Sequence, residues 1–327
     1  MLTLGDRQRA KLFGIFSNNL KYWLSKYNIV LSIKTKTGFQ KIDFAIVICP
    51  LCLRGYTIEA LNQSNPNPLT IEHVPPKSVG GKPLMLLCKE CNNSKGSEMD
   101  YEIQSMLEHE PFLKMQPNTS IPGKINLFDT SKLPLKLILN ENKNIIFQID
   151  TKGIFYVENR IVEQFSKSGP NSAKFEIKLP NKKLYSIALL RSGYLLAFNY
   201  FGYDFLFGDN ISIIRKQIQN PNEMLLPHSS LNTNDSSLQF AEGLHIVTSP
   251  SEFRSYVVIF KTKTANNVKY NTIFLPGPGA SGWEKYQNLK SINSSIILTL
   301  KELASIDMLK NPSLVDGYGD IWNNLIC

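Results

Sequence analysis

The stretch from Leu69 to Gly96 reads LTIEHVPPKSVGGKPLMLLCKECNNSKG. It begins with a β-prone run at 69–71, and the Pro and Gly pairs at 75–76 and 80–81 are typical of a loop. A continuous apolar run at 84–87 indicates a second, buried strand. The stretch therefore predicts two neighbouring strands joined by a loop.

A helix is predicted directly after the second strand, over about 97–109. Polar residues at 92–94 precede it, and its apolar residues recur three or four positions apart on one helical face. These residues are Met99, Ile103, Met106 and Leu107. The local order is therefore strand, loop, strand and helix, with one side of the helix packed inward.

Two cysteine pairs of the form C-x2-C bracket the two strands. They are separated by thirty-five residues and consist of Cys49, Cys52, Cys88 and Cys91. Two such pairs are the sequence form of a four-cysteine zinc site, in which four protein ligands leave no open position and the metal is structural. The alternatives are two disulfides or a redox pair, which are rare in a reducing compartment. Cys327 is expected to be a free thiol without a role.

These features together resemble the HNH endonucleases of the zinc-stapled ββα-metal type. The resemblance covers about residues 45–110, where six elements occur in the family's order. They are the first cysteine pair, Glu72-His73, Gly80-Gly81, the second cysteine pair, Asn92 and Lys95. The resemblance implies metal-dependent hydrolysis of phosphodiester bonds in DNA, with RNA not excluded as a substrate. It also suits bacterial or phage defence or mobile-element biology.

The same resemblance assigns roles to individual residues. His73 is the expected general base, and Glu72 and Asn92 are the expected ligands of a catalytic Mg²⁺ or Mn²⁺ ion. Lys95 is expected to meet a phosphate near the start of the helix. Two positions depart from the family pattern: Glu72 stands where Asp is commoner, and Pro83 stands where an Asn usually begins the second strand.

Simple chemistry agrees with these roles and adds a geometric requirement. A neutral histidine suits the activation of water, because its pKa lies near working pH. Carboxylate and amide oxygens suit a hard divalent cation. Glu72 and His73 are neighbours, so a regular strand would point them to opposite faces. The chain is therefore predicted to bend there, which Pro75-Pro76 favours.

Other interpretations of these residues remain open at this point. His73 could be an ordinary histidine, Asn92 and Asn93 could cap the helix, and Lys77, Lys82 and Lys95 could be solvated charges. The chain could accordingly be a non-catalytic nucleic-acid-binding zinc module, a degenerate relative of the nucleases. It could also be a partner-binding protein whose zinc is purely structural.

The composition of the 327 residues excludes several classes of protein. Lys and Arg number 36 against 27 Asp and Glu, a net charge of +9 that suits a polyanionic partner without locating it. The 43% of hydrophobic residues are enough for a core. No uninterrupted apolar run could span a membrane, and no N-terminal signal is visible, so a cytoplasmic protein is expected.

The remaining sequence predicts an α+β protein. We expect a nuclease module over 1–110, a linker over 111–123 and an α+β domain over 124–327. The nuclease module begins with a helix at about 6–27, which is expected to pack against the core, and strands near 28–33 and 41–47. The linker is predicted from the presence of Pro117 and Pro122. The C-terminal part could recognise target DNA, a protein partner or a signal ligand.

Elements of the C-terminal part follow from hydrophobic periodicity and turn signals. Strands are expected near 124–128, 133–139, 144–149, 153–157, 173–179, 245–248, 255–262 and 267–274. Helices are expected near 182–203, 210–218 and 298–308, and the first of these is apolar on both faces and therefore buried. The Gly-rich run at 276–282 is read as a loop. Lys261, Lys263, Lys269 and Tyr270 form either a nucleic-acid-facing or a solvated hairpin face.

Overall fold

The structure is a computed structural model in which most of the chain is described. It describes residues 3–36, 38–42, 44–94, 96–127, 132–149, 173–208, 210–223, 226, 230–233, 241–265, 267–277, 298–303 and 310. The strand expected near 153–157, most of the Gly-rich run at 276–282 and Cys327 lie outside these residues.

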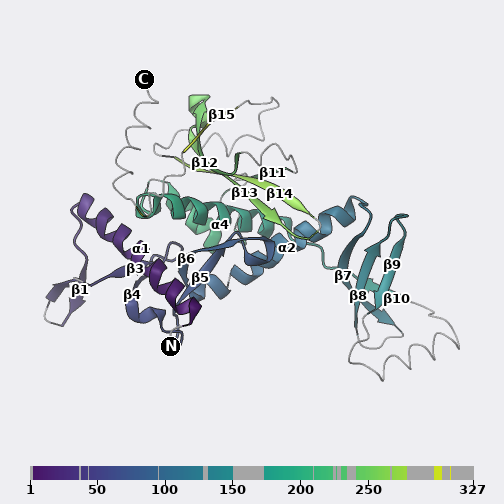
Figure 1. The fold of residues 1–327 in the computed structure, drawn as a ribbon, viewed down its shortest axis with the longest axis horizontal. Helices are drawn as coiled ribbons and strands as arrows, with labels where there is room; N and C mark the ends of the chain where they lie inside the picture. Colours follow the sequence, from purple (N-terminus) through teal and green to yellow (C-terminus); the bar gives the residue numbers. More distant parts are fainter. Residues whose placement is uncertain are drawn as a thin grey trace.

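The described residues form a mixed α+β fold (Figure 1). Its α-helices are α1 Leu4–Lys26, α2 Gly96–Leu113, α4 Lys182–Phe201, α5 Tyr203–Leu206 and α6 Ile211–Gln219. Its strands are β1 Ser32–Thr35, β2 Gly38–Lys41, β3 Ile46–Ile48, β4 Gly55–Thr57, β5 Leu69–Val74, β6 Lys82–Cys88, β7 Thr119–Leu127, β8 Leu133–Leu139, β9 Ile145–Ile149, β10 Ala173–Glu176, β11 Ser230–Thr233, β12 Gly243–Ser249, β13 Ser255–Lys263, β14 Val268–Pro276 and β15 Thr299–Glu302. Short helical turns are η1 Ile58–Leu61, η2 Lys77–Val79, η3 Glu90–Ser94 and η5 Ser251–Phe253.

The stretch that was expected to fold as strand, loop, strand and helix does so. β5 and β6 pair antiparallel, with Leu69 opposite Cys88. The loop between them contains η2, and η3 leads from β6 into α2. The predicted inward face of α2 is correct, because Met99, Ile103 and Leu107 are buried. Both strands and the helix are longer than the sequence patterns indicated.

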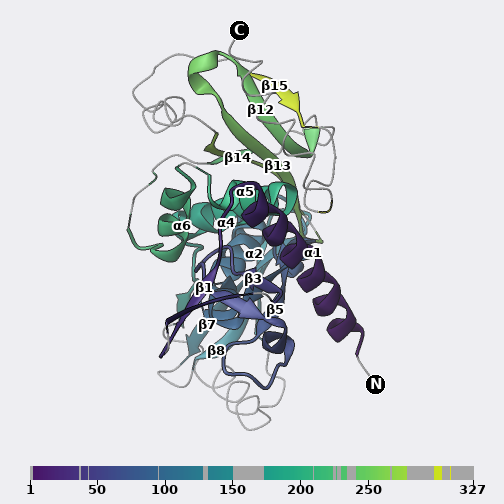
Figure 2. The same ribbon diagram turned by 90° about the vertical axis from the view of Figure 1, so that its left-hand side faces the viewer.

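α4 is the central helix of the molecule. Figures 1 and 2 show it between the five-stranded sheet and the layer that contains β5, β6 and α2. It is buried on nearly every side, as expected from its apolar sequence, and it packs against α2 and β14. The predicted helix at 182–203 is divided, because Gly202 adopts a left-handed φ of 65° and α5 starts after it.

α1 packs against the core, as expected. It buries Phe13, Phe16 and Leu20, and the ring of Phe16 stacks on that of Phe198 in α4 at 5.3 Å. One buried hydrophobic cluster consequently runs from Phe13 to Leu303 and includes residues of both halves of the chain. The division into 1–110 and 124–327 stays a prediction.

Two further sheets complete the described fold. A four-stranded antiparallel sheet, in the order β10-β7-β8-β9, has its own small core that includes Phe112 and Ile121. A five-stranded antiparallel sheet has the order β11-β14-β13-β12-β15. No helix among the described residues is long and apolar enough to cross a bilayer.

Several expected elements differ from the structure. Residues 111–113 end α2 and β7 begins at Thr119, so regular elements fill part of the 111–123 segment. The helix expected near 298–308 is wrong at its start, because 299–302 form β15 on the open edge of β12. The strands expected at 28–33 and 41–47 are instead the β1–β2 ribbon over 32–41 and β3 over 46–48.

The basic hairpin face is also not as expected. β13 and β14 do form a hairpin, but Lys269 and Tyr270 are buried in it. Lys269 is held by Glu110 of α2 at 2.6 Å. Lys269 therefore lies between α2 and the hairpin and Tyr270 is buried, whereas Lys261 and Lys263 of the same hairpin are exposed.

Gly193 permits the close packing of α4 on β14. A Cβ atom at this position would lie 2.7 Å from Ile273, whereas one at Gly14 in α1 would meet no atom within 4 Å. We expect Gly193→Ala to lower the free energy of unfolding by about 1–3 kcal/mol through overpacking. Gly14→Ala should raise it by about 0.5–1 kcal/mol, since alanine favours helix. Urea unfolding measures both, and equal effects would contradict this packing.

Candidate functional site

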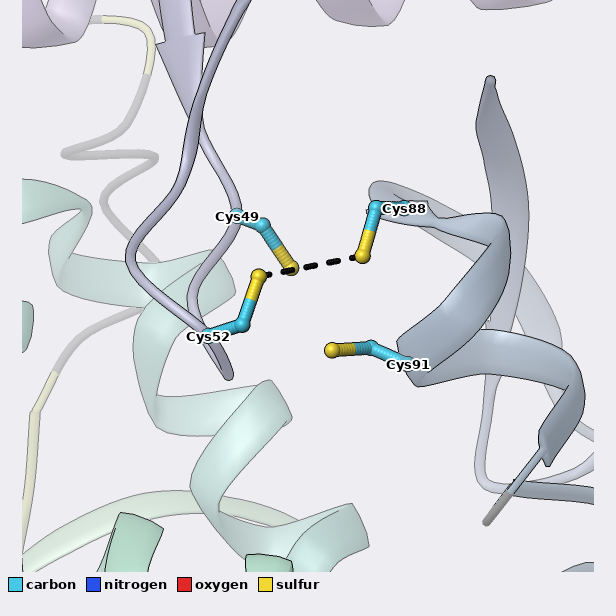
Figure 3. Close-up of side chains that lie close together, drawn as sticks. All are labelled: Cys49, Cys52, Cys88 and Cys91. Atoms are coloured by element: carbon cyan, nitrogen blue, oxygen red, sulfur yellow. Dashed lines mark hydrogen bonds between the residues drawn. The ribbon is translucent and has the colours of Figure 1, made fainter. Parts of the chain in front are cut away.

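Four cysteine side chains converge between the β3–β4 turn and the end of β6 (Figure 3). Their sulfur atoms all lie within 4.8 Å of one another, and the Sγ atoms of Cys52 and Cys88 are 3.7 Å apart. Tetrahedral zinc with Zn–S bonds of about 2.3 Å requires sulfur atoms about 3.8 Å apart. The four thiols therefore fit a zinc ion, and Cys49, Cys52, Cys88 and Cys91 come together as the sequence indicated.

Each cysteine pair sits in a backbone turn that presents its sulfurs to one side. In the first turn the Cys49 N–H donates to the Arg54 carbonyl at 3.0 Å, and the Leu53 N–H donates to the Cys49 carbonyl at 2.9 Å. In the second, β6 ends at Cys88 and Cys91 lies in the single turn η3. An exposed ion pair between Arg54 and Glu90, at 2.6 Å, joins the two turns.

Helices from the C-terminal part hold the first cysteine turn by hydrogen bonds. The Tyr194 hydroxyl of α4 donates to the Pro50 carbonyl at 2.6 Å, and the Gln219 amide of α6 donates to the Leu51 carbonyl at 2.5 Å. The Tyr203 hydroxyl of α5 accepts from the Ile48 N–H and donates to the Ile48 carbonyl, at 2.9 and 3.1 Å. Backbone groups beside the metal site are thus satisfied from more than 140 positions away along the chain.

The β5–β6 pairing shifts register where a bend between Glu72 and His73 was expected, but the extra residue lies in β6, and β5 itself is continuous there. Glu72 lies opposite Met85, but His73 lies opposite Pro83, so the register shifts by one residue and Leu84 is the extra residue. Pro83, which departs from the family pattern, is therefore the residue across from His73. His73 is partly exposed, and burial, with a smaller effect of the nearby Lys77 charge, lowers its pKa. A lowered pKa keeps the imidazole neutral at pH 7, as a general base requires.

The Asn92 side chain is anchored to β5 through its amide nitrogen. This nitrogen donates to the Thr70 hydroxyl at 2.9 Å and to the Ile71 carbonyl at 3.3 Å. Because the nitrogen is used in these bonds, the amide oxygen points elsewhere and can accept. Thr70 and Glu72 are two positions apart and share one face of the strand. Asn92 is therefore held on the face of β5 that also carries Glu72.

Glu72 is buried and faces a cation from α4. Its Oε1 lies 2.7 Å from Nη2 of Arg191, although the angle is too bent for a good hydrogen bond. Arg191 also lies 3.5 Å from Asp100 of α2. Burial raises the pKa of Glu72 to about 7, against the opposing effect of the Arg191 charge. One carboxylate oxygen is thus already engaged by the protein itself.

Arg191 is the residue of this site that the sequence patterns missed. A Cβ atom on Gly96 would lie 3.1 Å from its Nη2, so the glycine at the start of α2 leaves room for the guanidinium. The available signal was a single charged residue within the otherwise uncharged apolar run 184–201. Charged residues are almost never fully buried unless they are paired, so that run implied a partner without naming it. Lys95, the expected phosphate ligand, lies outside the described residues.

Comparison with known proteins finds a family model that matches part of the chain. Residues 62–108 match the family model described as HNH endonuclease. The matched segment contains β5, β6, the second cysteine pair and most of α2. Neither the curated proteins nor the solved structures gave a significant match. The family match indicates a nuclease-type function and a nucleic acid as the substrate.

The hydrogen bonds from α4, α5 and α6 to the first cysteine turn predict a global effect of metal loss. We expect the purified protein to contain about one zinc per chain. A strong chelator, or Cys91→Ser, should lower the helical circular dichroism signal, including the part that comes from α4, α5 and α6. The reason is that metal binding and folding are coupled. Restoring excess zinc to the chelated wild type is the control. Retention of the α4–α6 signal after zinc release would contradict the coupling.

The buried Glu72–Arg191 pair predicts an unequal effect of single and double substitutions. At about pH 8, above the pKa of Glu72 in the wild type, Arg191→Met removes the charge that lowers this pKa and leaves the buried carboxyl group without its cation, which should cost up to about 3–5 kcal/mol of unfolding free energy. Glu72→Gln/Arg191→Met should cost clearly less. At about pH 6 the loss in the single variant should shrink, because the carboxyl group takes up a proton. Urea unfolding decides, and an equal cost of single and double variants would argue against the pairing.

Proposed function

We propose that this chain is a metal-dependent HNH endonuclease that hydrolyses phosphodiester bonds in DNA. In this proposal β5, β6 and α2 form a ββα-metal motif, the four cysteines bind structural zinc, and His73 is the general base. Glu72 and Asn92 hold a catalytic Mg²⁺ or Mn²⁺ ion. The family match over 62–108 supports the class of reaction, and the geometry around β5 supports the assignment of residues.

The observation that carries the proposal is the gathering of Glu72, His73 and Asn92 where the β5–β6 pairing shifts register. Such a shift increases the local twist of the strand pair. Asn92 directly follows Cys91 in η3, and its side chain is bonded to Thr70 of the same strand, β5. The three residue types that hydrolysis of a phosphodiester needs are therefore gathered on one short strand and the turn beside it.

The oxygen atoms at this place fit a divalent ion. Asn92 offers a neutral amide oxygen, and Glu72 offers its second carboxylate oxygen, Oε2, while Oε1 faces Arg191. Mg²⁺ is usually bound by only one or two carboxylates and keeps several waters, so two protein ligands are enough. Such an ion, when bound, would neutralise charge on the phosphate and on the leaving oxygen.

His73 and Asn92 contribute separate functions to the reaction. The neutral imidazole of His73 accepts the proton of the attacking water, whose oxygen then bonds to phosphorus while the bond to the 3′ oxygen breaks. The products are a 5′-phosphate and a 3′-hydroxyl. Asn92 keeps its amide oxygen oriented because Thr70 and Ile71 hold its nitrogen. This orientation is set before substrate binds, which lowers the cost of assembling the site.

A plasmid-cleavage assay tests the proposal. Wild-type protein should nick or linearise supercoiled DNA with Mg²⁺ or Mn²⁺, and His73→Ala should be slower by about 10²–10⁴-fold because the base is lost. Lys216→Ala, on the exposed side of α6, is a matched control and should cleave at the wild-type rate.

Two outcomes would count against parts of the proposal. If wild-type protein binds DNA but cuts it with neither ion, the chain is a non-catalytic nucleic-acid-binding zinc module. If His73→Ala cuts as fast as wild type, His73 is not the base. Thermal unfolding of each variant shows whether a lost activity reflects a lost fold.

A further inference from the structure

A short basic ribbon stands apart from the rest of the molecule. The basic ribbon comprises residues 28–42, with β1 and β2 paired antiparallel from Ser32 opposite Lys41 to Thr35 opposite Gly38. Hydrogen bonding continues from the Ile42 N–H to the Leu31 carbonyl at 2.9 Å. The two strands pair with each other and have no extended contact with any other described helix or strand. Figure 1 shows the ribbon at the left, projecting from the body beyond β3.

Several large apolar side chains of the basic ribbon are exposed to an unusual degree. Phe39 is 77% exposed, Val30 65% and Ile33 53%. An isolated two-stranded ribbon is only marginally stable in water, because it has no second layer against which to bury a face. A ribbon of this kind is therefore expected to gain order and cover its apolar residues by binding something.

The charge of the basic ribbon indicates what it binds. Residues 28–42 contain three lysines and no acidic residue. Lys34 and Lys41 share one face of the ribbon with Phe39, because Lys34 is opposite Phe39 and Lys41 lies two positions further along the same strand. Lys36 is exposed at the tip. A surface with positive charges around an aromatic ring is complementary to a polyanion that carries apolar groups.

We propose that the basic ribbon is a DNA-contacting arm that enters the major groove of the duplex. This inference rests on the proposed nuclease function and adds a surface outside the β5–β6 site. The major groove of B-DNA admits a two-stranded ribbon, and the thymine methyl groups there offer apolar contacts for Phe39. The major groove of A-form RNA is deep and too narrow for such side chains. The arm therefore favours duplex DNA over duplex RNA.

A second copy of the chain fits the ribbon less well. Pairing two ribbons edge to edge would bring six lysines together. Like charges placed together in an interface are unfavourable, while phosphates neutralise lysines and release their counterions. The composition of the ribbon thus favours nucleic acid over self-association.

Binding measurements test the arm separately from cleavage. The full chain carrying His73→Ala is titrated against a fluorescent DNA duplex without Mg²⁺ or Mn²⁺. Adding Lys34→Gln, Lys36→Gln and Lys41→Gln should weaken binding at least about tenfold. It should also reduce the slope of log affinity against log salt by about 2–3, since each phosphate contact contributes about 0.9. The same substitutions should reduce the preference for DNA over an RNA duplex of equal sequence.

A matched triple variant controls for net charge. Lys136→Gln, Lys216→Gln and Lys301→Gln remove three exposed lysines from β8, α6 and β15 and should leave the affinity closer to that of the parent. All six side chains are exposed, so both triple variants should keep the parental unfolding temperature. Equal losses in the two triple variants would overturn the proposal.

One more variant separates DNA from a protein partner. Phe39→Ser should weaken DNA binding while the molar mass in solution stays unchanged. If it alters the molar mass and leaves DNA binding intact, the ribbon is a protein interface and the proposal fails. Binding is measured without cleavage, so the two proposals are tested separately. A wild-type protein that never cuts DNA would contradict the proposed nuclease activity, whereas the binding affinities alone test the DNA-contacting arm.

Discussion

The convergence of four cysteine sulfurs is the constraint on which the rest of the site depends. Cys49 and Cys52 follow β3, while Cys88 ends β6 and Cys91 lies in η3, so the cysteine cluster brings together two segments that share little other secondary structure. Asn92 follows the last of these cysteines, and its side chain is bonded to β5. The cluster also lies at the end of β6, the strand whose pairing with β5 shifts register at Glu72 and His73. A metal ion held by the four sulfurs would therefore stabilise the geometry around β5.

The carboxylate of Glu72 faces Arg191 and, in the proposed mechanism, would also bind a divalent ion. Its Oε1 faces Arg191 at 2.7 Å in a buried environment, and its proposed role needs the other oxygen for a divalent ion. Burying a charge without a partner is costly, so Arg191 stabilises the ionised form that a metal would need. The same guanidinium competes electrostatically with that metal. The longer side chain of Glu72, compared with aspartate, extends its carboxyl group further from the strand towards α4.

The sequence patterns identified the parts of the fold that depend on neighbouring residues. The β5–β6 hairpin, the inward face of α2 and the set of four cysteines followed from local spacing and chemistry. Arg191 did not, because its partner Glu72 lies far away in the chain and only the folded packing of α4 brings them together. β15 was read as helix, because its short polar sequence takes its conformation from pairing with β12. The burial of Lys269 likewise depends on Glu110 in another element.

The contacts around the cysteine turn also bear on which part of the chain is a self-sufficient unit. Without α4, α5 and α6, the Ile48, Pro50 and Leu51 backbone groups would lose their hydrogen-bond partners, and Glu72 would lose its counter-ion. Each buried polar group left unsatisfied costs about 1–3 kcal/mol, and a buried carboxylate costs more. Those losses together rival the whole stability of a small domain. The unit that carries the proposed chemistry therefore includes α4–α6, although the family pattern ends about seventy residues before α4 begins.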